Sequence, residues 1–345
     1  MKRIVSGLLA AVMCGAMLSG CGGQDKPTLR VYNWGDYIGE GVIEKFEEQY
    51  GVNVSYEVYD QNEDLYTKLK STGSSYDVII PSDYMISRMI NEDMLDTINK
   101  DNIPNLNLID ESFKNMSFDP DNNYSVPYMW GTIGIIYNKT MVDEPVDSWN
   151  ILWNEKYAGK IFMNDSVRDS IGVTLMSLGY SPNTKNMDEI EQAKQKLIDQ
   201  KPLILAYVGD EVKDKMIAGE AAFAVVYSGD AMNMIDANPD LDYVVPKEGS
   251  NVWFDGMCIP KNAQNKELGE KFINFMCSTE IAEINREYIC YASPQKEVVA
   301  NLPEELKNDV RAYPDEETLK RCKVYEDLGE MTSVYDEVWS AVKAA

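Results

Sequence analysis

The sequence contains no histidine, and this absence alone excludes several large classes of chemistry. Serine and cysteine nucleophiles that depend on an imidazole base are excluded, as are zinc and iron sites with histidine ligands. Enzymes that work with carboxylates alone, such as glycosidases, are still compatible with the composition. So are Ca²⁺ or Mg²⁺ sites built from oxygen ligands.

Basic residues are also scarce. The 32 lysines and arginines stand against 57 aspartates and glutamates, which gives a formal net charge of −25. Such an acidic chain repels phosphate, so we expect no binding to nucleic acid, whereas cations are attracted to it. Hydrophobic residues make up 44% of the 345 positions, enough to build a core in about two domains. Extensive disorder is therefore not expected.

Residues 1–20 are predicted to be an export signal rather than part of the fold. Two basic residues precede an apolar run over residues 4–17, which is shorter than the roughly 20 residues that a membrane span needs. The sequence Leu-Ser-Gly-Cys that ends at Cys21 resembles a bacterial lipobox, which implies that Cys21 carries lipid and anchors the protein to the membrane. Residues 22–27 then form a tether. The alternative is a plain signal peptide with an incidental cysteine.

Four further cysteines follow the export signal: Cys258, Cys277, Cys290 and Cys322. They allow three disulfide pairings, and the sequence does not choose among these pairings or exclude free buried thiols. No Cys-x-x-Cys spacing occurs, so we expect neither a metal site nor a redox role for these residues.

Hydrophobic periodicity predicts strands that alternate with helices. The predicted strands are residues 29–32, 52–58, 76–80, 133–137, 203–208, 221–227 and 243–245, and the predicted helices in the first third are 41–50, closed by Gly51, and 63–71. This alternation is typical of parallel α/β sheets. Because no linker rich in glycine and serine separates two units, we expect two lobes joined by ordered segments. Ligands of such folds bind beyond the carboxyl ends of strands.

Acidic and aromatic residues occur together at several of the predicted strand ends. The clusters are residues 33–37, 81–84, 164–169 and 227–230, with 253–255 and Tyr291 in addition. One by one these signals are weak, because a single tryptophan is more often core and a single aspartate is more often a helix N-cap. Their recurrence predicts a cleft that holds them together.

A cleft lined by carboxylates and aromatic rings suits an organic cation. Carboxylates neutralise ammonium groups, and each ring face attracts a cation by about 0.5–2 kcal/mol. Sugar-binding clefts also use aromatic platforms but do not require several acids. A bare metal ion requires oxygen ligands without the rings.

At these residues the sequence resembles the spermidine/putrescine-binding component of bacterial ABC transporters, a lipid-anchored or periplasmic solute-binding protein. The resemblance extends from about Leu29 to the C-terminus and includes residues 124–131, 147–149, 245–249 and 261–266. It implies an α/β fold of the type II periplasmic-binding-protein class. Each lobe is then a mixed sheet flanked by helices, and the ligand cleft lies at the hinge. We expect lobe 1 to comprise residues 28–136 plus 255–290, and lobe 2 residues 137–254 plus 291–345.

The resemblance also implies a set of ligand-binding residues, carried over motif by motif. They are Trp34, Asp36, Tyr37, Ser82, Tyr84, Asp169, Tyr227, Asp230, Trp253, Asp255, Tyr291 and Tyr325. In that pattern Asp169 and Asp255 bind ammonium groups, Trp253 stacks on the ligand chain, and Tyr291 closes one end.

Several positions depart from the spermidine-preferring pattern of this family. Ser166 stands where that pattern has an acid, Tyr227 where it has tryptophan, and Tyr325 where it has glutamine. Asp36 and Asp230 instead match acids of the putrescine-preferring pattern. The departures therefore favour putrescine slightly over spermidine.

The resemblance implies extracytoplasmic capture of putrescine or spermidine by a monomer, with delivery to an ABC permease at the periplasmic face or cell surface. No cofactor, metal or enzymatic activity is expected. A solute-binding protein for ferric iron, thiamine or a sugar is an alternative, although the adjacent tyrosines used for iron capture in related proteins are absent. A secreted carboxylate hydrolase and a purely structural lipoprotein are the remaining alternatives.

Overall fold

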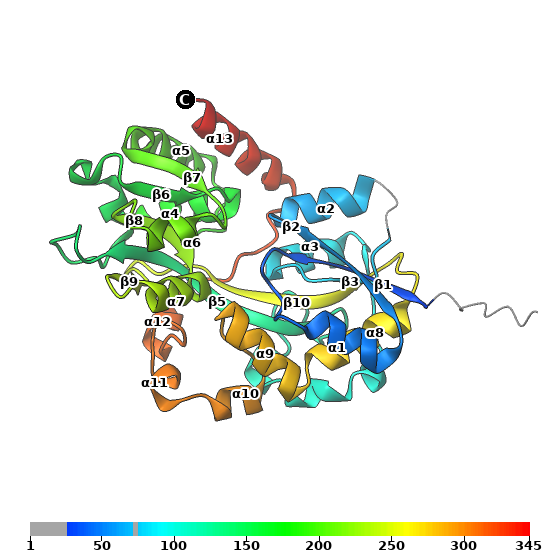
Figure 1. The fold of residues 1–345 in the computed structure, drawn as a ribbon. Helices are drawn as coiled ribbons and strands as arrows, with labels where there is room; N and C mark the ends of the chain where they lie inside the picture. The colour runs from blue at the N-terminus through cyan, green and yellow to red at the C-terminus, as the bar shows by residue number, and fades with distance from the viewer. Residues whose placement is uncertain (1–25, 72–74) are drawn as a thin grey trace, which may run out of the picture.

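The computed structural model describes residues 26–71 and 75–345 (Figure 1). The predicted export signal, Cys21 and residues 22–25 of the tether lie outside the described residues. Within the described part of the chain, no helix has both the length and the apolar character that crossing a membrane requires.

The first group of elements, called the first lobe here, forms one half of the molecule (Figure 1). It contains β1 (Thr28–Trp34), α1 (Val42–Tyr50), β2 (Asn53–Tyr59), α2 (Asn62–Ser71), β3 (Val78–Ile79), α3 (Asp83–Asn91), β4 (Leu95–Asp96), α8 (Lys266–Met276) and α9 (Thr279–Ile289). The predictions for its first elements are confirmed, and Gly51 ends α1 in the left-handed conformation with φ 66°. Its core includes Phe46, whose ring lies 5.0 Å from that of Phe272 and 5.3 Å from that of Phe275.

The second lobe is built around a separate hydrophobic core. It contains β6 (Ile161–Asn164), α4 (Val167–Ser177), α5 (Met187–Gln200), β7 (Ile204–Val208), α6 (Val212–Ile217), β8 (Phe223–Tyr227), α7 (Ser228–Ala237), β9 (Leu241–Val244) and α13 (Thr332–Ala344), which packs on α4 and α5. Trp149 is fully buried in this core, and its indole N–H donates to the carbonyl of Gly249 over 2.8 Å. The short helices α10 (Lys296–Asn301), α11 (Glu304–Lys307) and α12 (Glu316–Arg321) precede α13 in the chain.

Two long strands, β5 (Ser125–Asn138) and β10 (Val252–Pro260), join the lobes through the middle of the molecule (Figure 1). The strand order is β2-β1-β3-β10-β5-β8-β6-β7, with β4 on β10 and β9 on β5. Parallel pairing is confirmed for β1 with β2 and β3, and for β6 with β7 and β8. The central pair β5 and β10 is antiparallel, so the sheet is mixed.

The sequence analysis predicted only the second half of β5 and did not predict β10. Both strands are buried on both faces, so they lack the alternation that marks a half-buried strand. They also contain residues that are rare within strands, namely Pro127, Gly131 and Gly134 in β5 and Gly256 in β10. Tertiary packing therefore overrides weak local preference here.

The thiols of Cys258, Cys277, Cys290 and Cys322 are all free. The structure thus resolves the pairing question that the sequence left open. Three of these side chains are buried and Cys290 is partly exposed.

Candidate functional site

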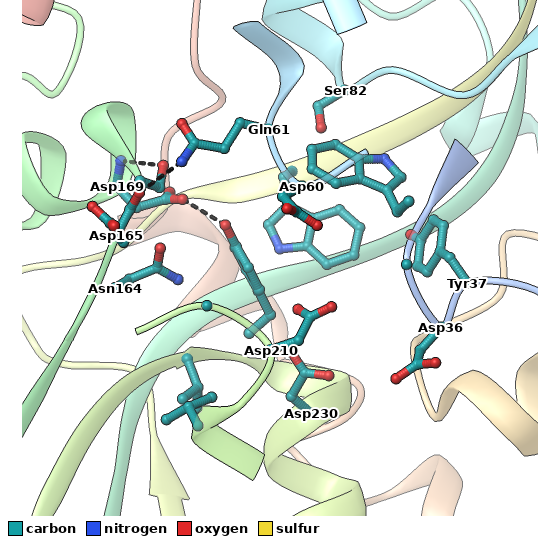
Figure 2. Close-up of a pocket in the computed structure, with 18 of the residues that line it drawn as sticks. Asp36, Tyr37, Asp60, Gln61, Ser82, Asn164, Asp165, Asp169, Asp210 and Asp230 are labelled. Carbon is teal, nitrogen blue, oxygen red and sulfur yellow. Dashed lines mark hydrogen bonds between the residues drawn. The ribbon is translucent and has the colours of Figure 1, made fainter. Parts of the chain in front are cut away.

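A cavity of about 860 Å³ lies where the lobes face each other, beyond the carboxyl ends of β1, β3, β6, β7 and β8. All twelve residues predicted as ligand-binding line it, and Figure 2 shows five of them by label. They are Trp34, Asp36, Tyr37, Ser82, Tyr84, Asp169, Tyr227, Asp230, Trp253, Asp255, Tyr291 and Tyr325. Residues from seven separate stretches of sequence therefore converge, including all the acid and aromatic clusters that the sequence singled out.

Asp255 lies at the centre of this arrangement, on the crossing strand β10. Its side chain is buried, and its Oδ2 atom accepts a hydrogen bond from the hydroxyl of Tyr37 over 2.8 Å. The Oδ1 atom is also buried and has no hydrogen-bond partner. Burial raises the pKa of Asp255 to about 7, while the hydroxyl groups of Ser82 and Tyr37 act in the opposite direction. The carboxylate thus presents to the cavity a buried acceptor atom with no protein partner.

Asp169 offers a second buried carboxylate, on the first turn of α4. The hydroxyl of Tyr227 donates to its Oδ2 atom over 2.7 Å, and burial raises its pKa. The backbone N–H of Asp169 donates to Ser166 Oγ over 3.3 Å, so Ser166 is the N-cap of α4. Asp169 is free of a capping role, and its side chain is available to the cavity.

Asp230 offers a third carboxylate, which is partly buried, on the first turn of α7. Its Oδ2 atom accepts a hydrogen bond from the hydroxyl of Tyr291 over 2.9 Å. Burial raises the pKa of Asp230 to about 6, although the nearby Lys213 lowers it. Tyr227 precedes α7 and no side chain caps this helix, so Asp230 is not an N-cap either.

Aromatic rings cover the space between these acids. The ring centroids of Trp253 and Tyr291 are 5.0 Å apart at an interplanar angle of 87°, and the ring of Tyr37 lies 5.7 Å from that of Tyr291. Trp253 also packs edge-on against Tyr227 at 6.0 Å. The hydroxyl of Tyr325 is buried without a hydrogen-bond partner, which leaves its oxygen able to accept from a ligand.

Three glycines make room for these rings. A Cβ atom at Gly131 would lie 2.7 Å from the indole of Trp253, and a Cβ atom at Gly172 or Gly229 would overlap Tyr325 or Tyr291, respectively. Glycine is therefore required by close approach of a side chain rather than by backbone conformation.

Two residues missed by the sequence analysis lie inside motifs that it had singled out. Asp83 is fully buried and accepts hydrogen bonds from the backbone N–H groups of Tyr84 and Phe254 over 2.6 and 3.0 Å. Burial raises its pKa to about 8. The guanidinium of Arg168 lies 5.0 Å from the ring of Tyr84 and 4.6 Å from that of Tyr325. The sequence prediction rested on acidic and aromatic residues at strand ends, so it did not include this arginine.

Two further missed residues, Asp210 and Lys213, follow strand β7. The segment after that strand has the same form as the clusters that were recognised, with an acid between a strand and a helix. Tyr207 stands three residues before Asp210, the same spacing as Tyr227 and Asp230, so the signal was present in the sequence and was missed. Figure 2 shows Asp210 beside Asp230, on the side of the cavity away from Asp169.

Direct contacts join the lobes across the cavity. The side-chain amide of Gln61, in the first lobe, donates to the carbonyl of Asp165, in the second, over 3.0 Å (Figure 2). Lys213 Nζ lies 3.3 Å from Asp36 Oδ2 of the first lobe. The two lobes are therefore in direct contact with each other, and the cavity lies between them.

The cavity has the character of a binding site for an elongated cation. Its buried carboxylates receive hydrogen bonds from neutral tyrosines, and its walls present ring faces. Across residues 26–71 and 75–345, no group of three or more acidic or cysteine side chains is placed to hold a metal ion.

Comparison with known proteins agrees with this fold and site. Residues 41–314 match the model of the bacterial extracellular solute-binding protein family. Over 346 residues, covering 100% of this chain and 99% of the relative, the sequence is 36% identical to the spermidine/putrescine-binding periplasmic protein of Escherichia coli K12.

Two solved structures extend the comparison. The substrate-binding protein PotD of a spermidine/putrescine ABC transporter from Streptococcus pneumoniae, in complex with calcium and HEPES, is 44% identical with a TM-score of 0.79, covering 92% of this chain and 99% of that chain. The TpPotD lipoprotein of Treponema pallidum is 32% identical with a TM-score of 0.82, covering 91% and 99%.

The two-lobed fold and the cavity between its lobes are those of a solute-binding protein. The chain belongs to the bacterial extracellular solute-binding protein family. Among its relatives are proteins named for spermidine and putrescine.

The pKa of Asp255 predicts how the stability of the ligand-free protein depends on pH. An aspartate with its ordinary pKa of 3.8 loses its proton well below the value of about 7 in the folded protein. Between these values the folded state keeps a proton that the unfolded state has released, so raising the pH favours unfolding. We expect the Asp255→Asn variant to lose less stability than the parent between about pH 5 and 8, by on the order of a few kcal/mol.

Urea unfolding at both pH values measures this difference. Asp93→Asn is the charge-matched control, since Asp93 is exposed, pairs with Lys261 and lies outside the cavity. An equal loss of stability in the parent and in Asp255→Asn would contradict the assignment.

Proposed function

We propose that this protein captures a linear polyamine, putrescine or spermidine, outside the cytoplasm and delivers it to an ABC permease for import. The observation that carries the proposal is the buried carboxylate of Asp255, whose Oδ1 atom lacks a partner in a cavity that the ring of Trp253 also lines. An ammonium group neutralises this charge and donates to its free acceptor, while the ring covers the adjacent methylene groups. The names of the relatives support the same ligand class.

Capture couples to movement of the lobes. In the proposed mechanism the cation enters an open acidic cleft, and contacts from both lobes then stabilise the closed form. The contacts of Gln61 with Asp165 and of Lys213 with Asp36 are available only when the lobes meet. The expected lobe boundaries place the hinge in the crossing strands β5 and β10, where a small change of twist moves one lobe against the other.

Attachment to the membrane through lipid on Cys21 is part of the proposal. Its support is the lipobox-like sequence and the Treponema pallidum relative, which is itself described as a lipoprotein. Binding and release leave the polyamine unchanged, and the protein acts as a monomeric carrier rather than an enzyme.

Calorimetry with putrescine and spermidine, at two salt concentrations, tests the proposal directly. We expect saturable binding of at least one amine that weakens as salt rises, because screening reduces the attraction between the cleft and the cation. No heat with either amine would contradict polyamine capture and favour another solute.

Loss of the central carboxylate should weaken polyamine binding strongly. Asp255→Ala leaves an ammonium buried without its partner, at a cost of about 2–5 kcal/mol in binding free energy. The measurement is calorimetric affinity, with Asp93→Asn as the control for removing one negative charge outside the cavity. An affinity equal to that of the parent would show that Asp255 does not contact the ligand.

Replacement of Trp253 by leucine keeps an apolar side chain but removes the ring face. We expect a fall in affinity of about 0.5–2 kcal/mol, the contribution of one cation–π contact, with the fold retained. Trp153→Leu is the control, because Trp153 is a partly buried tryptophan outside the cavity. Unchanged affinity in Trp253→Leu would mean that Trp253 serves the core alone.

A further inference from the structure

Two basic side chains, Arg168 and Lys213, line the cavity, and Lys213 lies among three carboxylates at one end of it. Lys213, on α6 of the second lobe, lines the cavity with only 21% of its side chain exposed. Its Nζ atom is 3.3 Å from Asp36 Oδ2 and 3.9 Å from Asp230 Oδ1. Asp210 is a third nearby carboxylate, and its negative charge raises the pKa of Lys213. The lysine therefore bridges acids of the two lobes at one end of the cleft.

The lysine is held in its charged form there. Burial lowers the pKa of Lys213, but the three neighbouring carboxylates outweigh this effect and raise the pKa above its ordinary value of 10.5. A primary ammonium on a flexible alkyl chain is also the chemical group that ends a polyamine. Lys213 thus presents to Asp36 and Asp230 the same group that a ligand would present.

Asp255 and Asp169, two other acids of the cavity, have different partners from Asp36 and Asp230. In the described part of the chain, neither Asp255 nor Asp169 forms an ion pair, and each accepts a hydrogen bond from a neutral tyrosine. Asp255 has the unpartnered Oδ1 atom described above. These two carboxylates are therefore without an ion-pair partner, although the charge of Arg168 acts on Asp169, whereas Asp230 has Lys213 at 3.9 Å.

We propose that Lys213 takes the place of a ligand ammonium at the Asp36 and Asp230 end of the cleft, so that the site accepts two ammonium groups and prefers a diamine to a triamine. This inference rests on the proposed polyamine function and specifies its ligand. A third ammonium meets the like charge of Lys213 and gains no free carboxylate in return. Neutralising the lysine leaves Asp36, Asp210 and Asp230 without a cation and opens a position for a third ammonium.

The test compares the affinities of putrescine and spermidine for the full chain and for Lys213→Met, which keeps the length of the side chain but removes its charge. We expect the ratio of spermidine affinity to putrescine affinity to rise by roughly tenfold or more in this variant, since close charge pairs in poorly hydrated sites commonly couple this strongly. Lys213→Arg retains the charge and should keep the ratio of the parent.

Lys215→Met is the matched control. Lys215 lies on the same helix, pairs with Glu220 at 3.8 Å and does not line the cavity, so its loss changes the net charge alone. Thermal unfolding establishes that each variant folds, and Lys213→Gln replaces Lys213→Met if the latter does not.

The outcomes separate the two proposals. If the parent binds neither amine, the proposed function fails, and this inference fails with it. If the parent binds an amine but Lys213→Met changes both affinities by the same factor, polyamine capture stands and the role of Lys213 is overturned. A rise in the ratio that also occurs in Lys213→Arg would overturn it as well, because the charge would not be the cause.

Discussion

The site depends on the cost of burying a carboxylate without a cation. Asp255 is buried on a strand at the middle of the sheet, and one of its oxygens has no partner. Removing such a group from water is expensive, and the raised pKa is the direct expression of that cost. An ammonium group that enters the cavity relieves it. The ligand-free protein therefore holds its acids in an unfavourable environment. Relief of this cost by a cation contributes to the free energy of binding.

Hydrogen bonds from three tyrosines reduce the free-energy cost of burying these carboxylates. Tyr37 donates to Asp255, Tyr227 to Asp169 and Tyr291 to Asp230, all between 2.7 and 2.9 Å. A neutral hydroxyl satisfies one acceptor of each acid but does not cancel its charge. The protein can thus fold with its acids buried while they still attract a cation. A lysine or arginine in the same positions would stabilise the empty site and compete with the ligand, and the position of Lys213 beside Asp36 and Asp230 has this consequence at one end.

Much of the site was predictable because it follows the ends of strands. Residues after β1, β3, β6 and β8 were recognised from acids and aromatics that recur at strand-to-helix junctions, and the geometry of an open α/β sheet brings such junctions together. The crossing strands were predicted poorly, since burial on both faces removes the alternating pattern. Asp255 and Trp253 were therefore found as an aromatic and acid cluster and through family resemblance, without their strand being predicted. Asp210 follows Tyr207 at the spacing of the recognised Tyr227 and Asp230 and could have been found, whereas Lys213 is neither acidic nor aromatic and gave no such signal.

The topology connects ligand binding with lobe movement. Trp253 and Asp255 belong to β10, which pairs with β3 of the first lobe and, through β5, with β8 of the second. In the proposed mode of binding the cation thus contacts the strand that joins the lobes as well as side chains on each of them. Contacts to one lobe alone would give affinity without closure, because they are equally available when the lobes are apart. Carboxylates contributed by β10, by α4 and by α7 favour the closed arrangement, since only there can one chain of methylene groups reach ammonium positions on both sides of the hinge.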